Sequence, residues 1–341
     1  MPAKKKSADN PNSLDAIMQK ANKDIGEATV MKLSDAPLDV PRVSSGNLGL
    51  DIILGGGYPR GRIVEGYGPH GSGKSGLALM MAAEVQKLGL KVVYVDVENS
   101  LDRKRAENLG VNVDDMYIGQ PPNGEMALEL IERALEADDC GAIVVDSVAA
   151  MQPEAILQGG YDDAHVGRQG KMMSQGLGKI NNAMTERAKR GQESPVVFFV
   201  NQIRSKIGGM SFGPSTTTSG GMALPFYASV RLEVVRTEMI KSGSDIVGHK
   251  VKITTRKNRV APPFQSIELD MLYDRGISNG SSVLDLGIKY GLIAQNGSWY
   301  AVVETGEKLG QGRVAAINAI EADPNIESDL SSQVRAIVES L

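Results

Sequence analysis

The stretch with the clearest chemistry is glycine-rich and ends in an amine and a hydroxyl. Residues 66–75 read Gly-Tyr-Gly-Pro-His-Gly-Ser-Gly-Lys-Ser, so that Gly68, Gly73, Lys74 and Ser75 fit GxxxxGK(S/T). Glycines let backbone N–H groups turn inward around phosphate oxygens, because no Cβ blocks the approach. A lysine at this place reaches the β- and γ-phosphates, and the hydroxyl binds magnesium. The pattern predicts a nucleoside triphosphate site; the alternative is a glycine-rich turn that binds nothing.

Acidic and amide side chains stand at or just after apolar runs of the strand type further along the chain. Asp146 is expected to position magnesium, usually through water, although a helix cap is the alternative. Glu98 is expected to orient and deprotonate the attacking water, with Asp96, on the same side of the pleat, as second choice. Gln202 could contact the γ-phosphate before hydrolysis and would need another partner afterwards.

The elements that must position these residues alternate between strand and helix. Apolar runs predict strands at 92–98, 142–147 and 195–202, and helical spacing follows residue 75 and recurs near residue 130. This alternation favours a parallel α/β sheet with right-handed crossovers, whose ligand lies at the carboxyl ends of the strands. Residues 229–234 and 266–271 alternate in polarity and predict half-buried strands that widen the sheet.

The chain of 341 residues suggests about two domains and an arm. We expect an arm at 1–35, with a helix that begins after Ser13 and a strand at 29–33, a nucleotide-binding core at 36–277, and a small α/β domain at 278–341 that has Trp299 in its core. A single cysteine excludes an internal disulfide and suits a reducing cytosol. No apolar run is long enough for a membrane span or a signal core, so we expect a cytoplasmic protein without membrane contact.

Basic residues gather in two strips although the net charge is −4. Residues 194–232 and 246–267 contain no Asp or Glu. Such a local excess of positive charge can mark a surface that binds phosphates; a solvated basic face is the open alternative. Two glycine-rich segments, 158–167 and 203–222, are either functional or disordered. Because the second follows Gln202 directly, we expect the state of ATP to control a binding surface.

Several further motifs accompany the phosphate loop: Val144–Ala150, Met172–Gln175, Asn201–Arg204, Thr216–Thr218 with Gly220-Gly221, Phe226–Arg231 and Gly310–Gly312. With them the chain resembles the bacterial RecA-type recombinases over nearly its whole length. The resemblance implies a RecA-like P-loop NTPase core, in which helices flank a mostly parallel sheet. It also implies an N-terminal helix-strand arm for polymerisation and a small C-terminal α/β domain.

The resemblance also implies roles for particular residues. Lys74, Glu98 and Gln202 would be catalytic, and Ser75 and Asp146 would hold Mg²⁺, the latter through water. The implied nucleotide contacts are Gly68, Pro69, His70, Gly71, Ser72, Gly73, Lys74, Ser75, Gly76, Asp102, Arg105, Asp146 and Ser147. The implied DNA contacts are Val166, Lys171, Arg204, Lys206, Ile207, Gly208, Gly220 and Gly221. Lys257 and Arg259 would reach the ATP of a neighbouring subunit, and the joint between subunits would include Val30, Met31 and Phe226.

Some positions depart from the family pattern. Arg105 stands where the family has an aromatic ring against adenine, so stacking would be by a guanidinium or weaker, and Asp102 becomes the surer adenine contact. Arg259 replaces a lysine, and His70-Gly71 replaces an acidic-polar pair in the phosphate loop. The chain ends at Leu341 without the acidic tail of the family, from which we expect less restraint on DNA binding and a weaker magnesium requirement.

Together these observations predict a DNA-dependent ATPase that uses ATP and Mg²⁺ and forms a helical filament on single-stranded DNA. It would pair homologous duplex DNA and exchange strands in recombination and repair. Its partners would be both DNAs, its own copies, and mediator, loader and repressor proteins. A ring-shaped helicase and an ATP-binding filament protein without turnover are the alternatives. The presence of both Glu98 and Gln202 argues against the second.

Overall fold

The computed structural model describes residues 10–25, 30–32, 34, 40–160, 167–205 and 216–340. The chain divides into two units, Met1–Val40 and Pro41–Leu341. The first holds α1 (Leu14–Ile25), where the Ser13 hydroxyl accepts a hydrogen bond from the Ala16 N–H at 3.2 Å. The predicted arm helix and its cap are therefore confirmed.

The strand expected at 29–33 is absent from the part of this range that the structure describes. Residues 30–32 have no strand geometry, and Thr29 and Leu33 lie outside the described residues. The Asn22 side chain donates to the Val30 carbonyl at 2.6 Å and accepts from its N–H at 2.7 Å. A strand needs a partner edge for its backbone groups, and here the amide of Asn22 takes that place.

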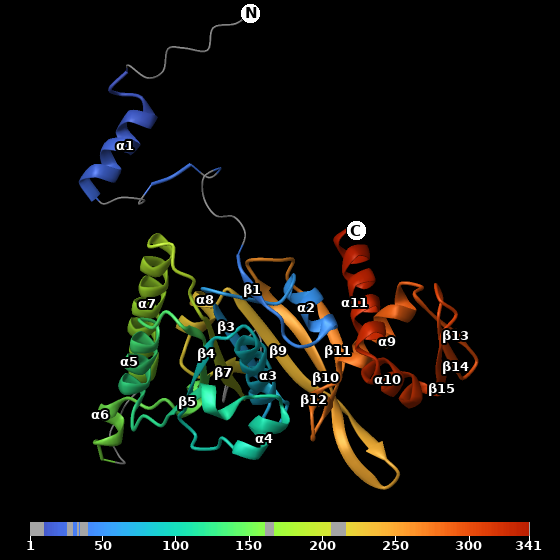
Figure 1. The fold of residues 1–341 in the computed structure, drawn as a ribbon. Helices are drawn as coiled ribbons and strands as arrows, with labels where there is room; N and C mark the ends of the chain where they lie inside the picture. The colour runs from blue at the N-terminus through green and yellow to red at the C-terminus, as the bar shows by residue number, and fades with distance from the viewer. Residues whose placement is uncertain are drawn as a thin grey trace, which may run out of the picture. The chain divides into compact units, whose positions relative to one another are not determined.

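The largest sheet of the second unit has ten strands, in the order β12-β11-β10-β9-β3-β7-β6-β4-β5, with β8 paired to β7 (Figure 1). Neighbours from β9 to β5 are parallel, and those from β12 to β9 are antiparallel. The sheet confirms the mostly parallel α/β class. Its strands are β3 (Ile63–Gly68), β4 (Lys91–Asp96), β5 (Met116–Gly119), β6 (Cys140–Asp146), β7 (Val196–Ser205), β8 (Thr216–Thr218), β9 (Val230–Ser242), β10 (Asp245–Asn258), β11 (Ser266–Leu272) and β12 (Gly276–Ile277).

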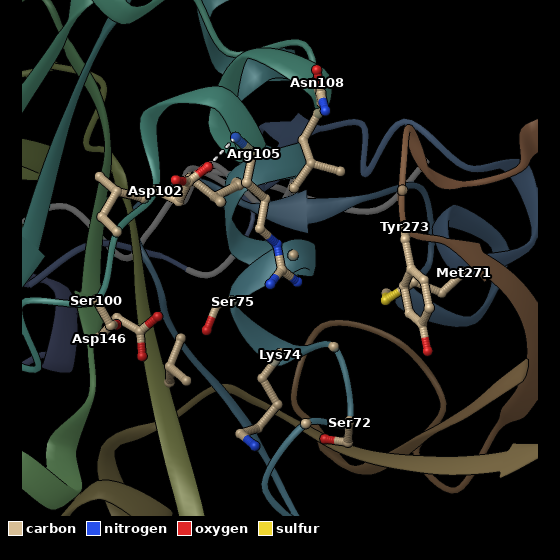
Figure 2. A pocket seen from close by; sticks show the side chains of 18 of the residues that line it. Ser72, Lys74, Ser75, Ser100, Asp102, Arg105, Asn108, Asp146, Met271 and Tyr273 are labelled. Carbon is tan, nitrogen blue, oxygen red and sulfur yellow. Dashed lines mark hydrogen bonds between the residues drawn. The ribbon is translucent and has the colours of Figure 1, made fainter. Parts of the chain in front are cut away.

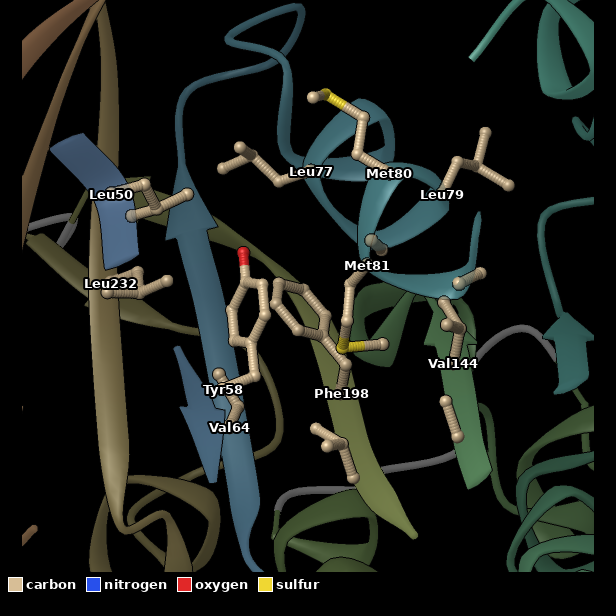
Figure 3. Close-up of a cluster of buried hydrophobic side chains, with 14 of the residues drawn as sticks. Leu50, Tyr58, Val64, Leu77, Leu79, Met80, Met81, Val144, Phe198 and Leu232 are labelled. Atoms are coloured by element: carbon tan, nitrogen blue, oxygen red, sulfur yellow. The ribbon is translucent and has the colours of Figure 1, made fainter. Parts of the chain in front are cut away.

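Both faces of the central strands are buried. Phe198 of β7 packs in one apolar cluster with α3, and the next residue, Phe199, packs in another with α5 and α7. Figure 3 shows Tyr58 against Phe198, whose rings meet edge to face at 5.8 Å. Packing on both faces fixes the strand ends that carry the site. The covering helices are α2 (Leu48–Leu54), α3 (Lys74–Lys87), α4 (Arg103–Asn108), α5 (Gly124–Ala134), α6 (Glu154–Leu157), α7 (Arg168–Lys189) and α8 (Ala223–Tyr227), and β1 (Arg42–Val43) pairs with β2 (Tyr58–Pro59).

The last sixty residues, together with Leu48 of α2, form a separate apolar cluster around a three-stranded antiparallel sheet. Tyr300 is buried in it, whereas Trp299 is 51% exposed, so the prediction of Trp299 in the core is wrong. Neighbouring residues of a strand face opposite sides, and here the inward side belongs to Tyr300. The elements are α9 (Asn279–Lys289), β13 (Ile293–Asn296), β14 (Trp299–Val302), β15 (Lys308–Gln311), α10 (Arg313–Ala322) and α11 (Pro324–Glu339).

The basic strip at 246–267 contains a long strand that the sequence analysis did not predict. β10 pairs with β9 in an antiparallel hairpin, which projects beyond the other strands in Figure 1. Val251 and Ile253 face the core on either side of Lys252, so the apolar alternation is short and is hidden by the charged residues beside it. Among the described helices, none combines the length and the apolar character that a membrane crossing requires.

Candidate nucleotide-binding site

The carboxyl ends of β3, β4, β6 and β7 meet at one edge of the sheet beside a cavity of about 590 Å³. The parallel register places Gly68 opposite Gln202 and Asp96 opposite Asp146. Most of the predicted catalytic and nucleotide-binding residues lie on the cavity wall (Figure 2): His70, Gly71, Ser72, Gly73, Lys74, Ser75, Gly76, Glu98, Asp102, Arg105, Asp146 and Gln202. Gly68, Pro69 and Ser147 are not on this wall but adjoin it in the chain.

The phosphate loop between β3 and α3 depends on close contacts at its glycines. Gly73 has a φ of +98°, and a Cβ there would lie 2.4 Å from the Met271 sulfur. A Cβ on Gly68 would lie 2.0 Å from the Val234 carbonyl oxygen. Apart from the two residues next to Gly71 in the chain, no described atom lies within 4 Å of the place of a Cβ on Gly71. This part of the loop therefore faces open space. The antiparallel strands β9 and β11 therefore shape the loop from behind and leave its front free.

Lys74 is held inside the loop. Its Nζ donates to the carbonyl oxygens of Gly68 at 3.1 Å and Pro69 at 2.7 Å. Burial lowers the pKa of Lys74, and the nearby carboxylates of Asp146 and Glu98 act in the opposite direction. The first turn of α3 has no side-chain cap, so its N–H groups point toward the cavity with their partial positive charge. The loop thus offers an ammonium and free N–H groups to an anion.

Asp146 lies in a hydrogen-bonded group of oxygen atoms. Its Oδ2 accepts from the Tyr94 hydroxyl at 2.7 Å, and Ser75 also donates to it. Burial raises the pKa of Asp146, while the bonds from Ser75 and Tyr94 lower it. In the described part of the chain, no cluster of three or more His, Cys, Asp or Glu could hold a metal ion. Magnesium bound with a phosphate chain needs only one or two protein ligands, and the Ser75 hydroxyl and the Asp146 carboxylate can supply them.

Glu98 is joined to two predicted site residues. The Gln202 Nε2 donates to Glu98 Oε1 at 3.0 Å, and the Ser147 hydroxyl donates to the same oxygen. Asp96, the second choice as base, instead holds the following loop: its carboxylate accepts hydrogen bonds from the N–H groups of Ser100 at 3.1 Å and Leu101 at 3.0 Å. Of the two carboxylates, Glu98 is the one on the cavity wall.

The residue before Gln202 connects the cavity to the end of the 203–222 segment. The Asn201 Nδ2 donates to the carboxylate of buried Glu65 at 2.9 Å and to the Ser219 carbonyl at 3.1 Å. The Ser219 N–H donates in turn to the Gln202 carbonyl at 3.3 Å. β8 then pairs with β7, with Thr218 opposite Ile203. A displacement of Gln202 would therefore reach both ends of this segment.

The predicted DNA contacts lie partly within the described residues. Gly220 and Gly221 have φ of +82° and +76°. A Cβ on Gly221 would be 3.5 Å from the Cα of Gly170, at the start of α7, and exposed Lys171 follows directly. The fold thus places two segments that are distant in the sequence next to each other, one with Lys171 and one with Gly220 and Gly221. Val166, Lys206, Ile207, Gly208 and the side chain of Arg204 lie outside the described residues.

The predicted trans cations are not on the wall of the cavity in their own chain. Lys257 Nζ donates to the carbonyls of Pro225 at 2.8 Å and Phe226 at 2.9 Å, and Arg259 donates to Phe226 at 3.3 Å. Phe226 is 68% exposed, as expected of an interface residue. Of the other predicted interface residues, Met31 is 50% exposed, and Val30, partly buried, bonds to Asn22 within the smaller unit.

The sequence analysis missed a wall of the cavity that comes from β10 and the end of β11. His249, Met271 and Tyr273 line it, and the rings of His249 and Tyr273 lie 5.8 Å apart. Burial lowers the pKa of His249. The alternating pattern placed Met271 on a buried face, but nothing in the sequence showed that this face meets the phosphate loop.

Fold and site together define the class of P-loop NTPases. Residues 12–278 match the RecA N-terminal domain family, and residues 281–339 match the RecA C-terminal domain family. Protein RecA of Levilactobacillus brevis is 44% identical over 326 residues, which cover 95% of this chain and 84% of that protein. Protein RecA of Halalkalibacterium halodurans is 43% identical over 330 residues, which cover 96% and 92%.

The chain therefore belongs to the RecA family, and the resemblance stated from its motifs is confirmed. The solved structure of the RadB recombinase has a TM-score of 0.50 at 19% identity and covers 69% of this chain and 98% of that one. At this identity the likeness concerns the fold alone, and it agrees with the RecA-like core described above.

Proposed function

We propose that the protein is a Mg²⁺-dependent ATPase, stimulated by single-stranded DNA, that forms a helical filament, pairs homologous duplex DNA and exchanges strands. A recombinase role in homologous recombination and repair follows from its membership of the RecA family. The observation that carries the finer proposal is the junction at residues 201 and 202. Gln202 contacts the candidate base, and Asn201 contacts the end of the candidate DNA-binding segment.

ATP and Mg²⁺ suit the residues of the cavity. The buried Ser72 hydroxyl is without a hydrogen-bond partner among the described residues, and the front of the loop at Gly71 is open. Lys74 and the first N–H groups of α3 would bind the phosphates, and Ser75 and Asp146 would hold magnesium. Magnesium supplies neutralisation of the phosphate charge at such a site.

Glu98 would take the proton of the attacking water, because it is the carboxylate on the cavity wall with its orientation fixed by Ser147 and Gln202. Gln202 has one side-chain NH₂ group to divide between Glu98 and a phosphate oxygen. A nucleotide that draws it from Glu98 would move Asn201 and, through it, Ser219. The segment 203–222 would in this way bind DNA according to the state of the nucleotide.

The remaining parts of the proposal concern assembly. Lys257 and Arg259 would complete the site of a neighbouring copy, with Phe226, Val30 and Met31 at the joint. In this arrangement residues 1–35 serve as the arm, 36–277 as the core and 278–341 as the small terminal domain. The protein would act in the cytoplasm, where loader, mediator and repressor proteins are candidate partners.

The test is ATP hydrolysis measured against added single-stranded DNA, for the wild type and for Glu98→Gln. We expect DNA to stimulate the wild type, and the variant to bind ATP and DNA while its turnover falls by about 10²–10⁴-fold, the usual contribution of a general base. Glu107→Gln, which changes an exposed carboxylate paired with Arg103, should behave as the wild type. A wild-type rate that ignores DNA would contradict the proposal, and closed hexamers without open filaments in electron micrographs would favour the helicase alternative.

A further inference from the structure

Arg105 points to the phosphate loop. Figure 2 shows its side chain extending from α4 into the cavity toward Ser75. Its Nη2 lies 3.9 Å from the place of a Cβ on Gly76, in the first turn of α3. Asp102 instead turns back to its own helix, where Oδ1 accepts from the Arg105 N–H at 2.7 Å. The guanidinium is thus directed at the start of α3.

This placement brings positive groups together, and neither of the two carboxylates on the cavity wall near Lys74, Asp146 and Glu98, pairs with the Arg105 guanidinium. The start of α3 carries partial positive charge, and the Lys74 ammonium lies in the same loop. In the described part of the chain, the Arg105 guanidinium has neither an ion pair nor a hydrogen bond, whereas Arg103 on the same helix pairs with Glu107 at 2.8 Å. A free cation that faces a helix N-terminus is stabilised by an anion between the two.

Two buried polar side chains point to the same conclusion independently of Arg105. Ser72 is 1% exposed and His249 is 5% exposed, and both line the cavity. The Ser72 hydroxyl is without a hydrogen-bond partner among the described residues, and the ring of His249 has only a contact of poor geometry with the Ser72 backbone. His249 Nε2 is 3.8 Å from the place of a Cβ on Gly73. A buried hydroxyl and a buried imidazole beside the phosphate loop can each donate one hydrogen bond to a ligand with several acceptor oxygens.

We propose that Arg105 binds the phosphate chain of the nucleotide held by its own chain, from the side that faces the phosphate loop, rather than stacking on the base. The inference rests on the nucleotide site of the proposed function and replaces the stacking role expected from the sequence. With this contact, the affinity for nucleotide depends more on the charge of the phosphates and on ionic strength than it would with an aromatic residue at position 105.

The test is calorimetric titration of the full chain with Mg-ATP and Mg-ADP, for the wild type, Arg105→Lys and Arg105→Tyr. A phosphate contact predicts that the lysine variant stays within about threefold of the wild type and that the tyrosine variant binds about tenfold more weakly, the loss of one charge-assisted bond. The tyrosine variant should also lose part of the salt dependence. Stacking predicts the reverse order. Arg105 is exposed, so all variants should fold, and Arg103→Tyr is the matched control.

The outcomes separate this inference from the proposed function. Tight nucleotide binding by Arg105→Tyr with unchanged salt dependence would overturn the phosphate contact and leave the ATPase proposal intact. A wild type that binds neither nucleotide would overturn both. Binding by the wild type and by Arg105→Lys, together with weak binding by Arg105→Tyr, supports the inference.

Discussion

Two lysines at different places in the molecule are held in the same way. Lys74 donates to the carbonyls of Gly68 and Pro69, and Lys257 donates to those of Pro225 and Phe226. Burial is the main cause that lowers the pKa of each. A carbonyl pair satisfies an ammonium without neutralising it, so each lysine remains available to an anion.

The surroundings of the two lysines differ. Asp146 and Glu98 act on Lys74 and favour its charge. Arg259 and Arg231 act on Lys257 and disfavour it, against Glu65 alone. The first site therefore has compensating carboxylates in its own chain, and the second has an excess of positive charge. This difference supports the proposal that the anion for Lys257 comes from another molecule, which in the proposed filament is the nucleotide of the neighbouring copy.

The largest effect is expected at Lys74. Lys74→Ala removes the ammonium that would neutralise the phosphates, so ATP hydrolysis should fall by about 10³-fold or more, the scale of a lost electrostatic contact to a transferring phosphoryl group. Nucleotide binding should weaken in the unassembled chain as well, measured by calorimetry. Lys87→Ala, at the other end of α3 and exposed, is the control. Hydrolysis within tenfold of the wild type would place the phosphates elsewhere.

A smaller and different effect is expected at Lys257. Lys257→Met should leave nucleotide binding by the unassembled chain unchanged and lower DNA-stimulated hydrolysis by about 10²-fold or more, because a trans cation acts only across an interface. An equal mixture with Lys74→Ala should recover about a quarter of the wild-type rate, since about a quarter of randomly formed head-to-tail interfaces join the two intact lysines. No recovery in filaments that form normally would show that Lys257 acts within its own chain.

The sequence predicted the site residues on the parallel strands better than the contacts that the antiparallel strands make with them. Lys74, Asp146 and Gln202 could be placed together because parallel strands bring their carboxyl ends to one edge. The contact between Met271 and Gly73 could not be predicted, because it joins residues almost two hundred positions apart through packing alone.

The other differences are local ambiguities that packing resolves. Trp299 and Tyr300 are neighbours of similar character, and only the surrounding helices decide which one faces inward. The direction of Arg105 was equally open, because a long flexible side chain at a helix start can reach the base or the phosphates. At 29–33 the β-type residues had no partner edge within the described part of their unit, so residues 30–32 stayed outside any strand.

The smallest effect expected is a pH dependence of hydrolysis that comes from Lys257. The pKa of Lys257 is lowered from 10.5 to about 8, so its ammonium is lost as the pH rises through about 8. DNA-stimulated hydrolysis should then decline by a few-fold above that pH, and Lys257→Arg, which stays charged, should lack the decline.

The lowered pKa of Lys257 also predicts how the free energy of unfolding changes with pH. Between about pH 8 and pH 10.5 the unfolded chain binds more protons at Lys257 than the folded chain. The stability of the wild type relative to Lys257→Met should therefore rise with pH across this window, measured by urea unfolding at matched ionic strength.

Glu65→Gln removes the carboxylate that raises the pKa of Lys257, so it should move the midpoint of the decline in hydrolysis to lower pH. A midpoint that stays in place would mean that Glu65 does not contribute to the field at Lys257, and the contrast between the two lysines would then rest on Arg231 and Arg259 alone.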